Sequence, residues 1–465
     1  MAQTRWLLIK AKQAVLSPHH TTSPASVLVD RHTGKVVQVN DNPSLVTFVH
    51  EQDLEILELT EDQVLMPGLV DAHVHLNEPG RTEWEGFETG TRAAAAGGIT
   101  TVIDMPLNAI PPTTTRDHFE TKLDAAQRQC HVDVGFWGGV VPDNASELPA
   151  LMQRGVRGFK CFLIESGVDE FPCVGEAEVR LAMDQMVNSD RVLLFHAEME
   201  AESRNPVTVD RSYTSFLNSR PQLLETSAID MIIRLTREYH QRGTPVRTHI
   251  VHLSAASALP SIRQAKAEGL PLTVETCFHY LNFTAEAIPD GATHFKCCPP
   301  IRETANREEL WEALLDGTID YVVSDHSPCT AQLKKLDTGD FGQAWGGIAS
   351  VQFGLPVLWS EGRKRGVTLQ NVVNWLSYAP ANQVRLGHRK GEVRVGHDAD
   401  FVVWRPQATF DIQKSDVHFK NKLSPYIGQS FFGPVDRTIV RGQTAYDRGD
   451  ANLFAREPVG QSLLG

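Results

Sequence analysis

The strongest constraint on the fold is an alternation of short apolar runs with longer helical stretches, which extends from about residue 66 to about residue 385 of the 465-residue chain. Such an alternation is typical of parallel strands joined by crossover helices. Eight strand candidates share this character, at residues 69–75, 100–105, 132–140, 156–162, 192–197, 246–253, 272–278 and 319–325. Helices are predicted between them, among others at residues 86–96, 176–187, 226–242, 257–269 and 306–315. Eight strand–helix units predict an α/β fold, a (β/α)8 barrel of the TIM type.

A doubly wound open sheet is the alternative for such a pattern. That fold carries a glycine-rich phosphate loop directly after its first strand. No such loop follows residues 69–75, and the pair Gly97-Gly98 precedes a strand, where it predicts the end of a helix. The barrel is therefore the preferred prediction.

Both ends of the chain carry short β-like runs without a long helical period. Before the barrel these runs cover residues 6–9, 26–29, 36–39 and 56–59, and after it they cover residues 391–395, 400–404 and 436–441. We predict that residues 1–65 and 386–465 together form one small composite β-sandwich domain, and that residues 66–385 form the barrel.

Charge and composition exclude several classes of function. The net charge of −13 argues against nucleic acid or an anionic membrane as partner, and no apolar run approaches the ~20 residues that a membrane span needs. The seven cysteines, an odd number, predict free thiols in a reducing compartment. We expect a cytoplasmic protein without a peroxisomal signal. Mitochondrial import is the alternative, because the first 29 residues lack acidic side chains.

Six polar side chains lie at the carboxyl ends of five predicted strands, the edge at which such barrels build their active sites. They are His73, His75, Lys160, His196, His252 and Asp325. Each has a structural explanation on its own, since a strand-end histidine is often a core residue and an aspartate can cap the following helix. Six such residues at matching positions favour one shared site.

The chemistry that these side chains permit is metal-assisted hydrolysis. Imidazole and carboxylate are common ligands of divalent ions, and two ions can generate a bridging hydroxide and polarise a substrate carbonyl. Asp325 is then the expected general base and acid, which takes the proton of the hydroxide and passes it to the leaving nitrogen. An ammonium at Lys160 would be repelled by two dications. We therefore predict that CO2 converts its amine to a carbamate, which offers one oxygen to each metal.

Other residues near the predicted strand ends have secondary roles. Residues 330–348 follow the eighth strand and are a candidate lid. His249 lies three residues before His252, hence on the opposite face of its strand, and is predicted to be structural. His279 and His326 are candidates for supporting the metal ligands through hydrogen bonds.

Several unusual motifs recur in a fixed order along the chain. They are HVHLNEPGRTEWEGF at 73–87, DMPLN at 104–108 with Pro111-Pro112-Thr113, GFKCF at 158–162, ETCFHYL at 275–281 and GHDAD at 396–400. Together they resemble the amidohydrolase superfamily, specifically the cyclic-amidohydrolase branch that contains dihydroorotases, dihydropyrimidinases (hydantoinases) and allantoinases. The resemblance covers nearly the whole chain and is greatest to the allantoinases.

This resemblance implies a ligand set and an activity. His73, His75 and Asp325 would hold the first metal, His196 and His252 the second, and carboxylated Lys160 would bridge both. The expected cofactors are two divalent ions per subunit, zinc before Mn, Fe, Co or Ni. The expected activity is hydrolysis of the cyclic amide of allantoin to allantoate in purine breakdown, by a homotetramer. The expected substrate contacts are Asn108 and Cys298.

Three positions of this chain differ from the residues that related families of the branch carry there. Asn77 stands where dihydroorotases carry an arginine that binds the substrate carboxylate, which favours an uncharged ring, although Arg81 nearby offers another cation. Glu165 stands where dihydropyrimidinases carry a tyrosine, and Cys298 stands where relatives carry serine or asparagine. Hydrolysis of other hydantoins or of dihydrouracil remains the alternative activity. A non-catalytic dihydropyrimidinase-related scaffold is disfavoured, because all six predicted ligand positions are retained.

Overall fold

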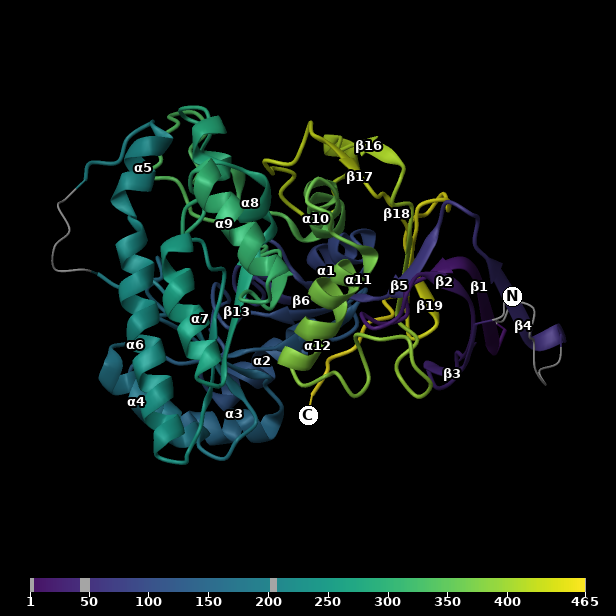
Figure 1. Ribbon diagram of the computed structural model, residues 1–465, viewed down its shortest axis with the longest axis horizontal. Coiled ribbons are helices and arrows are strands. Elements are labelled where there is room, and N and C mark those ends of the chain that lie inside the picture. The colour runs from purple at the N-terminus through teal and green to yellow at the C-terminus, as the bar shows by residue number, and fades with distance from the viewer. Residues whose placement is uncertain (1–3, 42–50, 201–206, 465) are drawn as a thin grey trace.

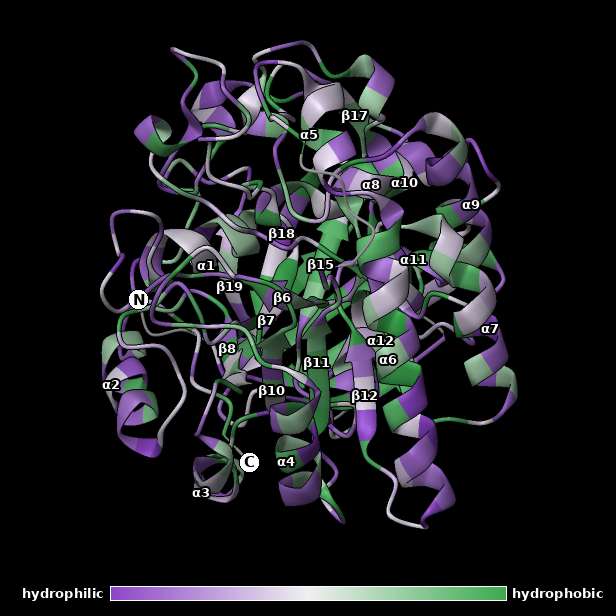
Figure 2. Cartoon of the chain, turned by 90° about the vertical axis from the view of Figure 1, so that its left-hand side faces the viewer, coloured by the Kyte–Doolittle hydropathy of each residue, from purple (hydrophilic) through white to green (hydrophobic). Residues whose placement is uncertain are grey.

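The computed structural model describes residues 4–41, 51–200 and 207–464, which form a barrel flanked on one side by a twisted β-sheet (Figure 1). Barrel strands such as β11 (Val192–His196) are apolar and lie inside, although β12 (Arg247–Ile250) begins with hydrophilic residues, and the surrounding helices alternate apolar and polar faces (Figure 2). This is the arrangement that the alternating pattern predicts for parallel strands covered by amphipathic helices. No helix among the described residues is long and apolar enough to cross a membrane.

All eight predicted barrel strands are confirmed, and the third is divided at Trp137 into two short strands. Three strands pair in parallel in the order β6-β7-β8, and six more pair in the order β14-β13-β12-β11-β10-β9. Their bounds are β6 (Leu69–Val74), β7 (Ile99–Asp104), β8 (Asp133–Phe136), β9 (Gly138–Gly139), β10 (Gly158–Phe162), β11 (Val192–His196), β12 (Arg247–Ile250), β13 (Leu272–Cys277) and β14 (Tyr321–Val323).

The two sheets close into one barrel. At one seam the backbone N–H of His75 donates to the carbonyl of His326 at 2.8 Å, beside a parallel bridge between Val74 and His326. At the other seam the chain runs directly from β8 into β9, and Arg157 N–H donates to the carbonyl of Phe136 at 2.8 Å. The predicted TIM-type barrel is therefore confirmed.

Helices follow most barrel strands, and all five of the helices named from the sequence are present. The glycine pair ends α1 as predicted: Gly97 N–H bonds to the carbonyl of Ala93 at 3.1 Å, and Gly98 adopts a positive φ of 87°. The α-helices are α1 (Phe87–Ala96), α2 (Arg116–Ala126), α3 (Leu148–Arg154), α4 (Glu176–Met186), α5 (Tyr213–Ser219), α6 (Gln222–Gln241), α7 (Leu259–Ala267), α8 (Phe278–Asn282), α9 (Thr304–Leu315), α10 (Gly354–Arg363), α11 (Leu369–Val373) and α12 (Ala379–Gln383).

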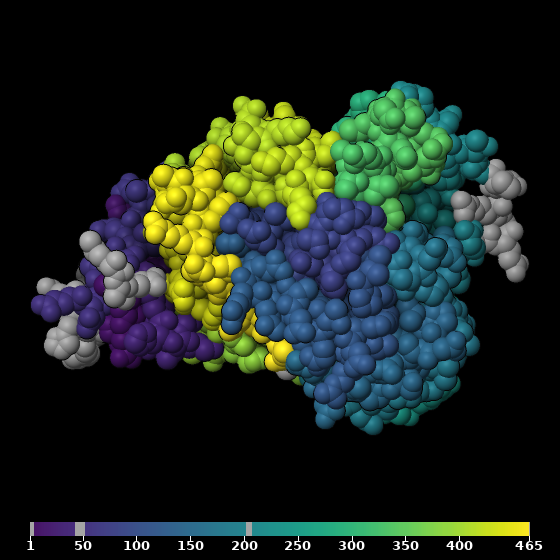
Figure 3. Space-filling view, turned by 180° about the vertical axis from the view of Figure 1, so that it is seen from behind, coloured from purple at the N-terminus to yellow at the C-terminus, as the bar shows by residue number. Residues whose placement is uncertain are grey.

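The small β-unit combines strands from both ends of the chain, as predicted (Figure 3). Its main sheet has the order β19-β18-β15-β5-β1-β2-β3, with β4 beside β1. The strands are β1 (Trp6–Ala14), β2 (Ser23–Asp30), β3 (Lys35–Asn40), β4 (Leu54–Glu58), β5 (Val64–Pro67), β15 (Phe401–Trp404), β18 (Val435–Val440) and β19 (Gln443–Asp447), and a separate hairpin pairs β16 (Thr409–Asp411) with β17 (Ser430–Phe432). The exact domain boundaries at residues 65 and 386 stay a prediction.

Alternate side chains of β15 pack into two different hydrophobic cores, on opposite faces of the strand. This explains why its sequence is apolar throughout. Phe401 and Val403 pack into the core of the small unit, whereas Val402 and Trp404 pack into the core shared with the barrel. The strand predicted at 391–395 is wrong. Gly391 and Gly396 adopt positive φ angles that bend the chain at both ends of this segment.

Candidate metal centre

A cavity of about 310 Å³ opens at the carboxyl ends of the barrel strands, and all six side chains predicted to form a site line it. His73 and His75 come from the end of β6, Lys160 from β10, His196 from β11, and His252 and Asp325 from the turns that follow β12 and β14. Six side chains from residues 73 to 325 thus converge on one point because parallel strands end at the same edge of the barrel.

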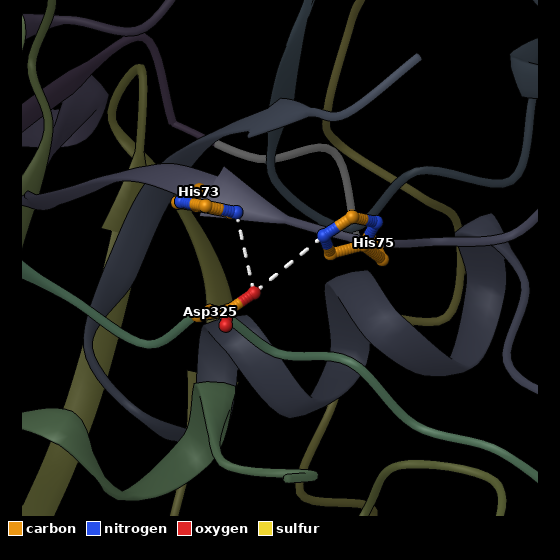
Figure 4. Close-up of side chains that lie close together, drawn as sticks. All are labelled: His73, His75 and Asp325. Atoms are coloured by element: carbon orange, nitrogen blue, oxygen red, sulfur yellow. Dashed lines mark ion pairs between the residues drawn. The ribbon is translucent and has the colours of Figure 1, made fainter. Parts of the chain in front are cut away.

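The first cluster consists of His73, His75 and Asp325 (Figure 4). Oδ1 of Asp325 lies 3.2 Å from Nε2 of His73 and 3.5 Å from Nε2 of His75, and all three side chains are buried. Although burial opposes ionisation, the two rings lower the pKa of the Asp325 carboxyl well below its usual range. Two imidazole nitrogens and a carboxylate oxygen so close together fit one divalent ion.

A buried carboxylate fixes the orientation of His73. Glu275 places Oε1 2.6 Å from Nδ1 of His73, and its Oε2 lies 3.1 Å from Nε2 of His249. Burial opposes ionisation of Glu275, but His73 and His249 lower the pKa of its carboxyl to about 2. Because Nδ1 of His73 is held by a carboxylate, Nε2 is left to face the cavity. His249 is structural, as predicted, and acts through Glu275.

A second carboxylate orients His196 in the same way. Oε2 of Glu198 lies 2.7 Å from Nε2 of His196, and Arg220 donates two hydrogen bonds to Glu198, from Nε at 2.9 Å and from Nη2 at 2.6 Å. The ring of His196 stacks on Phe162 at 4.5 Å and meets the ring of His252 edge-on at 4.6 Å. Nδ1 of His196 is therefore the nitrogen available to an ion.

The three most buried rings of the site are neutral near pH 7. Burial lowers the pKa of His73 and His196, and lowers that of His252 well below its usual range. Neutral imidazole is the form that binds metals. His252 and Asp325 also adopt positive φ angles of 39° and 42°, a sparsely populated conformation for non-glycine residues.

Lys160 is buried in the lining of the cavity, and its Nζ forms no hydrogen bond or salt bridge with the described residues. Its nearest recorded ring contact is Phe162, 5.1 Å from Nζ to the ring centroid. Desolvation lowers the pKa of the Lys160 amine to about 8. A buried lysine without a salt bridge to the described residues fits a neutral amine that can react with CO2.

The residues predicted to contact substrate separate into two groups. Asn108 and Cys298 line the cavity, and Nδ2 of Asn108 lies 3.5 Å from Nδ1 of His75. Asn77 is buried outside the cavity lining and donates to the carbonyl of Pro328 at 3.3 Å. Arg81 also lies outside the lining, because it pairs with Glu170 and donates to the carbonyl of Asn108 at 2.6 Å.

Two cationic side chains of the cavity lining were not predicted from the sequence. Arg220 follows α5 and Lys296 precedes Cys297, and neither lies at the end of a barrel strand. Nζ of Lys296 donates to the carbonyl of Ala344 at 2.6 Å. No periodic signal marks either residue, because both lie on irregular loops.

The segment predicted as a lid, residues 330–348, contributes one wall of the cavity. Leu333 and residues 343–347 line it, and the ring of Trp345 lies edge-on to that of Trp84, 4.8 Å away. Of the two predicted supporting histidines, His326 places Nε2 3.2 Å from Glu85 Oε2 and accepts from the N–H of Ser350 at 3.0 Å. His279 is buried near Asp325, and neither of its ring nitrogens has a hydrogen-bond partner among the described residues. Closure of the lid stays a prediction.

Known proteins resemble this chain along most of its length. A model of the amidohydrolase family matches residues 64–445. The allantoinase of Saccharomyces cerevisiae is 48% identical over 446 residues, which cover 95% of each chain. The mitochondrial allantoinase of Aquarana catesbeiana is 55% identical over 374 residues, which cover 80% of this chain and 76% of the relative. Among solved structures, the L-hydantoinase (dihydropyrimidinase) of Arthrobacter aurescens has a TM-score of 0.87 at 27% identity and covers 99% of both chains.

Proposed function

Because this chain belongs to the amidohydrolase family, we propose that it is a hydrolase that opens the hydantoin ring of allantoin and releases allantoate. The observation that carries the proposal is the convergence of four imidazoles, one carboxylate and one unpaired lysine on a single buried cavity. This donor set suits a pair of divalent ions, which is the cofactor arrangement of the family.

Two divalent ions bound there would polarise the substrate carbonyl and lower the pKa of the attacking water. His73, His75 and Asp325 are the proposed ligands of one ion, and His196 and His252 those of the other. We propose zinc for both. Lys160, as a carbamate, would hold both ions, and its burial in the cavity lining without a salt-bridge partner among the described residues supports this role.

Asp325 is the proposed proton carrier. Its carboxylate is buried and ionised, and Ser327 Oγ donates to Oδ1 at 3.2 Å. In the forward reaction it accepts the proton of the attacking water and returns it to the ring nitrogen as the amide C–N bond breaks. Asn108 and Cys298 are the proposed substrate contacts, because both side chains line the cavity beside the proposed ligands.

The identity of the substrate is supported by the allantoinases that match most of this chain, and by the cavity itself. Arg220, one of its cations, is neutralised by Glu198, and Arg81 is turned away toward Glu170. No arginine of the described cavity lining is therefore left unpaired to bind the carboxylate of dihydroorotate, which supports an uncharged ring as the substrate. We further propose a homotetramer in the cytoplasm, with mitochondria as the alternative compartment.

A substrate panel tests this proposal. Purified, metal-replete protein is assayed on allantoin, hydantoin, dihydrouracil and dihydroorotate, with the metal content measured on the same sample. We expect turnover of allantoin well above the others, with about two metals per chain. Preferred turnover of hydantoin or dihydrouracil would support the dihydropyrimidinase alternative. Metal content near zero without turnover would support a non-catalytic scaffold.

A further inference from the structure

A second polar cavity lies at the opposite end of the barrel from the metal centre, at the amino ends of β10 and β11. Its volume is about 400 Å³. Three arginines and a histidine share the lining with a single carboxylate, and the lining residues are Arg157, Asp190, Arg191, Asn382, Arg385, Gly387 and His388. The chain as a whole carries a net charge of −13, so this cavity is positively charged within a negatively charged protein.

Arg157 is the most unusual member of this group. It is only 1% exposed, and no carboxylate pairs with it in the described part of the chain. Nη2 donates to the carbonyl of Leu463 at 2.9 Å, whereas Nε is buried without any hydrogen-bond partner. Buried guanidinium groups are normally paired with an anion, because an uncompensated charge is costly to remove from water.

Asp190, the one carboxylate of the cavity lining, already pairs with two other arginines. Asp190 lies 3.6 Å from Arg191 and 3.2 Å from Arg385, and its backbone carbonyl accepts from Arg247 at 3.1 Å. It forms no salt bridge with Arg157. Burial, with the neighbouring charges of Arg191 and Arg389, lowers the pKa of Arg157 to about 10, and the charge of Asp190 offsets this only in part.

We propose that this cavity binds a small oxyanion, a phosphate or a carboxylate. The planar forks of Arg157, Arg191 and Arg385 match the oxygen geometry of such groups, and the guanidinium of Arg157 has no carboxylate partner among the described residues. The site is separate from the metal centre, because the three residue steps from Arg157 to Lys160 along the extended chain span roughly 10 Å. It lies on the same strands, since Arg191 directly precedes β11, which ends at His196.

Thermal unfolding of the metal-loaded protein with inorganic phosphate tests the proposal. In an anion-poor buffer, phosphate is expected to raise the Tm by a few degrees and to saturate at millimolar concentration, with a Kd measurable by calorimetry. Acetate tested in parallel distinguishes a phosphate site from a carboxylate site. Sodium chloride at matched ionic strength controls for general screening.

The variants Arg385→Ala and Arg191→Ala locate the binding. Both are expected to weaken phosphate binding at least fivefold. Arg263→Ala is the matched control, because Arg263 is 45% exposed and pairs with Asp316, much as Arg385 is 49% exposed and pairs with Asp190. Arg157→Leu is expected to abolish binding, although the two partly exposed variants carry the test if it fails to fold.

Three results would overturn the proposal. The first is no saturable effect of either anion on the wild-type protein. The second is an equal effect of chloride at matched ionic strength. The third is unchanged binding in both Arg385→Ala and Arg191→Ala, which would place the anion elsewhere, for example on the metal ions.

Discussion

Among the described residues, three buried groups contain three potential metal ligands each, and two of these groups share Asp325. The surroundings of the Asp325 groups differ from those of the third group. At the top of the barrel, His73, His75 and Asp325 face an open cavity. Between the barrel and the small β-unit, Asp133, Asp398 and Asp400 are equally close together. In this third group Nζ of Lys390 contacts all three carboxylates, at 2.8, 3.1 and 2.6 Å.

The buried lysine beside each cluster, Lys160 at the cavity and Lys390 between the barrel and the small β-unit, explains the difference. The three carboxylates around Lys390 raise the pKa of its amine despite burial, so the protein supplies its own cation at the position where an ion would bind. Lys160 forms no salt bridge with the described residues. Desolvation lowers the pKa of its amine to about 8, and the charges of Asp325 and Glu275 offset this only in part. A cluster of ligand residues therefore indicates a metal site only where the chain itself does not supply the neutralising charge.

The largest expected effect of a substitution is on catalysis at the first cluster. Asp325→Asn should lower kcat/KM for allantoin by about 10²–10⁴-fold, because the amide cannot accept the proton of the attacking water. Metal binding should weaken as well, while the fold is retained. Steady-state kinetics with metal analysis of the same sample measures both. Turnover close to that of the wild type would contradict the role given to Asp325.

At the cluster around Lys390 the expected effect is on stability. Lys390→Met leaves three carboxylates without their shared cation, and we expect a loss of about 3–5 kcal/mol in the free energy of unfolding. Lys35→Met is the control, since Lys35 is 36% exposed and contacts only Asp398, and it should cost about 1 kcal/mol or less. Urea denaturation measures both, and activity per folded molecule should not change. Equal losses in the two variants would refute the comparison.

Smaller effects are expected from the carboxylates that orient the metal ligands. Glu275→Gln should weaken binding of the ion held by His73, and Glu198→Gln should weaken binding of the ion held by His196, each by about 10–100-fold. Metal titration followed by calorimetry separates the two ions. Glu85→Gln is the control, because Glu85 contacts His326 and none of the proposed ligands. Loss of the same ion in both variants would contradict the proposal that Glu275 and Glu198 each orient the ligand of a different ion.

The smallest expected effect is the pH dependence of reactivation. The pKa of the Lys160 amine lies near 8, so its neutral fraction rises from about 10% at pH 7 to about 90% at pH 9. Only the neutral amine reacts with CO2, and recovery of metal-stripped enzyme at fixed dissolved CO2 should therefore accelerate roughly tenfold over this range. A rate that does not change with pH would argue against carbamate formation at this residue.

The barrel and the six cavity residues could be predicted from the sequence because both follow local rules. Apolar runs mark the strands, and a polar residue at the end of a strand points to the shared edge of the barrel. The composite β-unit followed from the same short periodic runs at both ends of the chain. Residues 391–395 misled the prediction, since a turn at each end prevents the segment from joining the sheet.

The groups that orient the cavity residues could not be predicted in this way. Glu275 bonds to His73 across 202 residues, and Arg220 reaches Glu198 from an irregular loop. Such pairs form only when the barrel closes and leave no periodic trace in the sequence. Asn77 stands where dihydroorotases carry an arginine that binds the substrate, but here it is buried outside the cavity lining, with a positive φ of 62°.

The central claim is that Lys160 carries a carbamate between two metal ions. The most direct measurement is ¹³C NMR of protein reconstituted with ¹³C-bicarbonate and zinc, combined with metal analysis of the same sample. We predict one carbamate signal and two metal ions per chain, with the signal absent from Lys160→Arg, whose guanidinium cannot take up CO2. A fully active, metal-loaded wild-type enzyme without a carbamate signal would contradict the account.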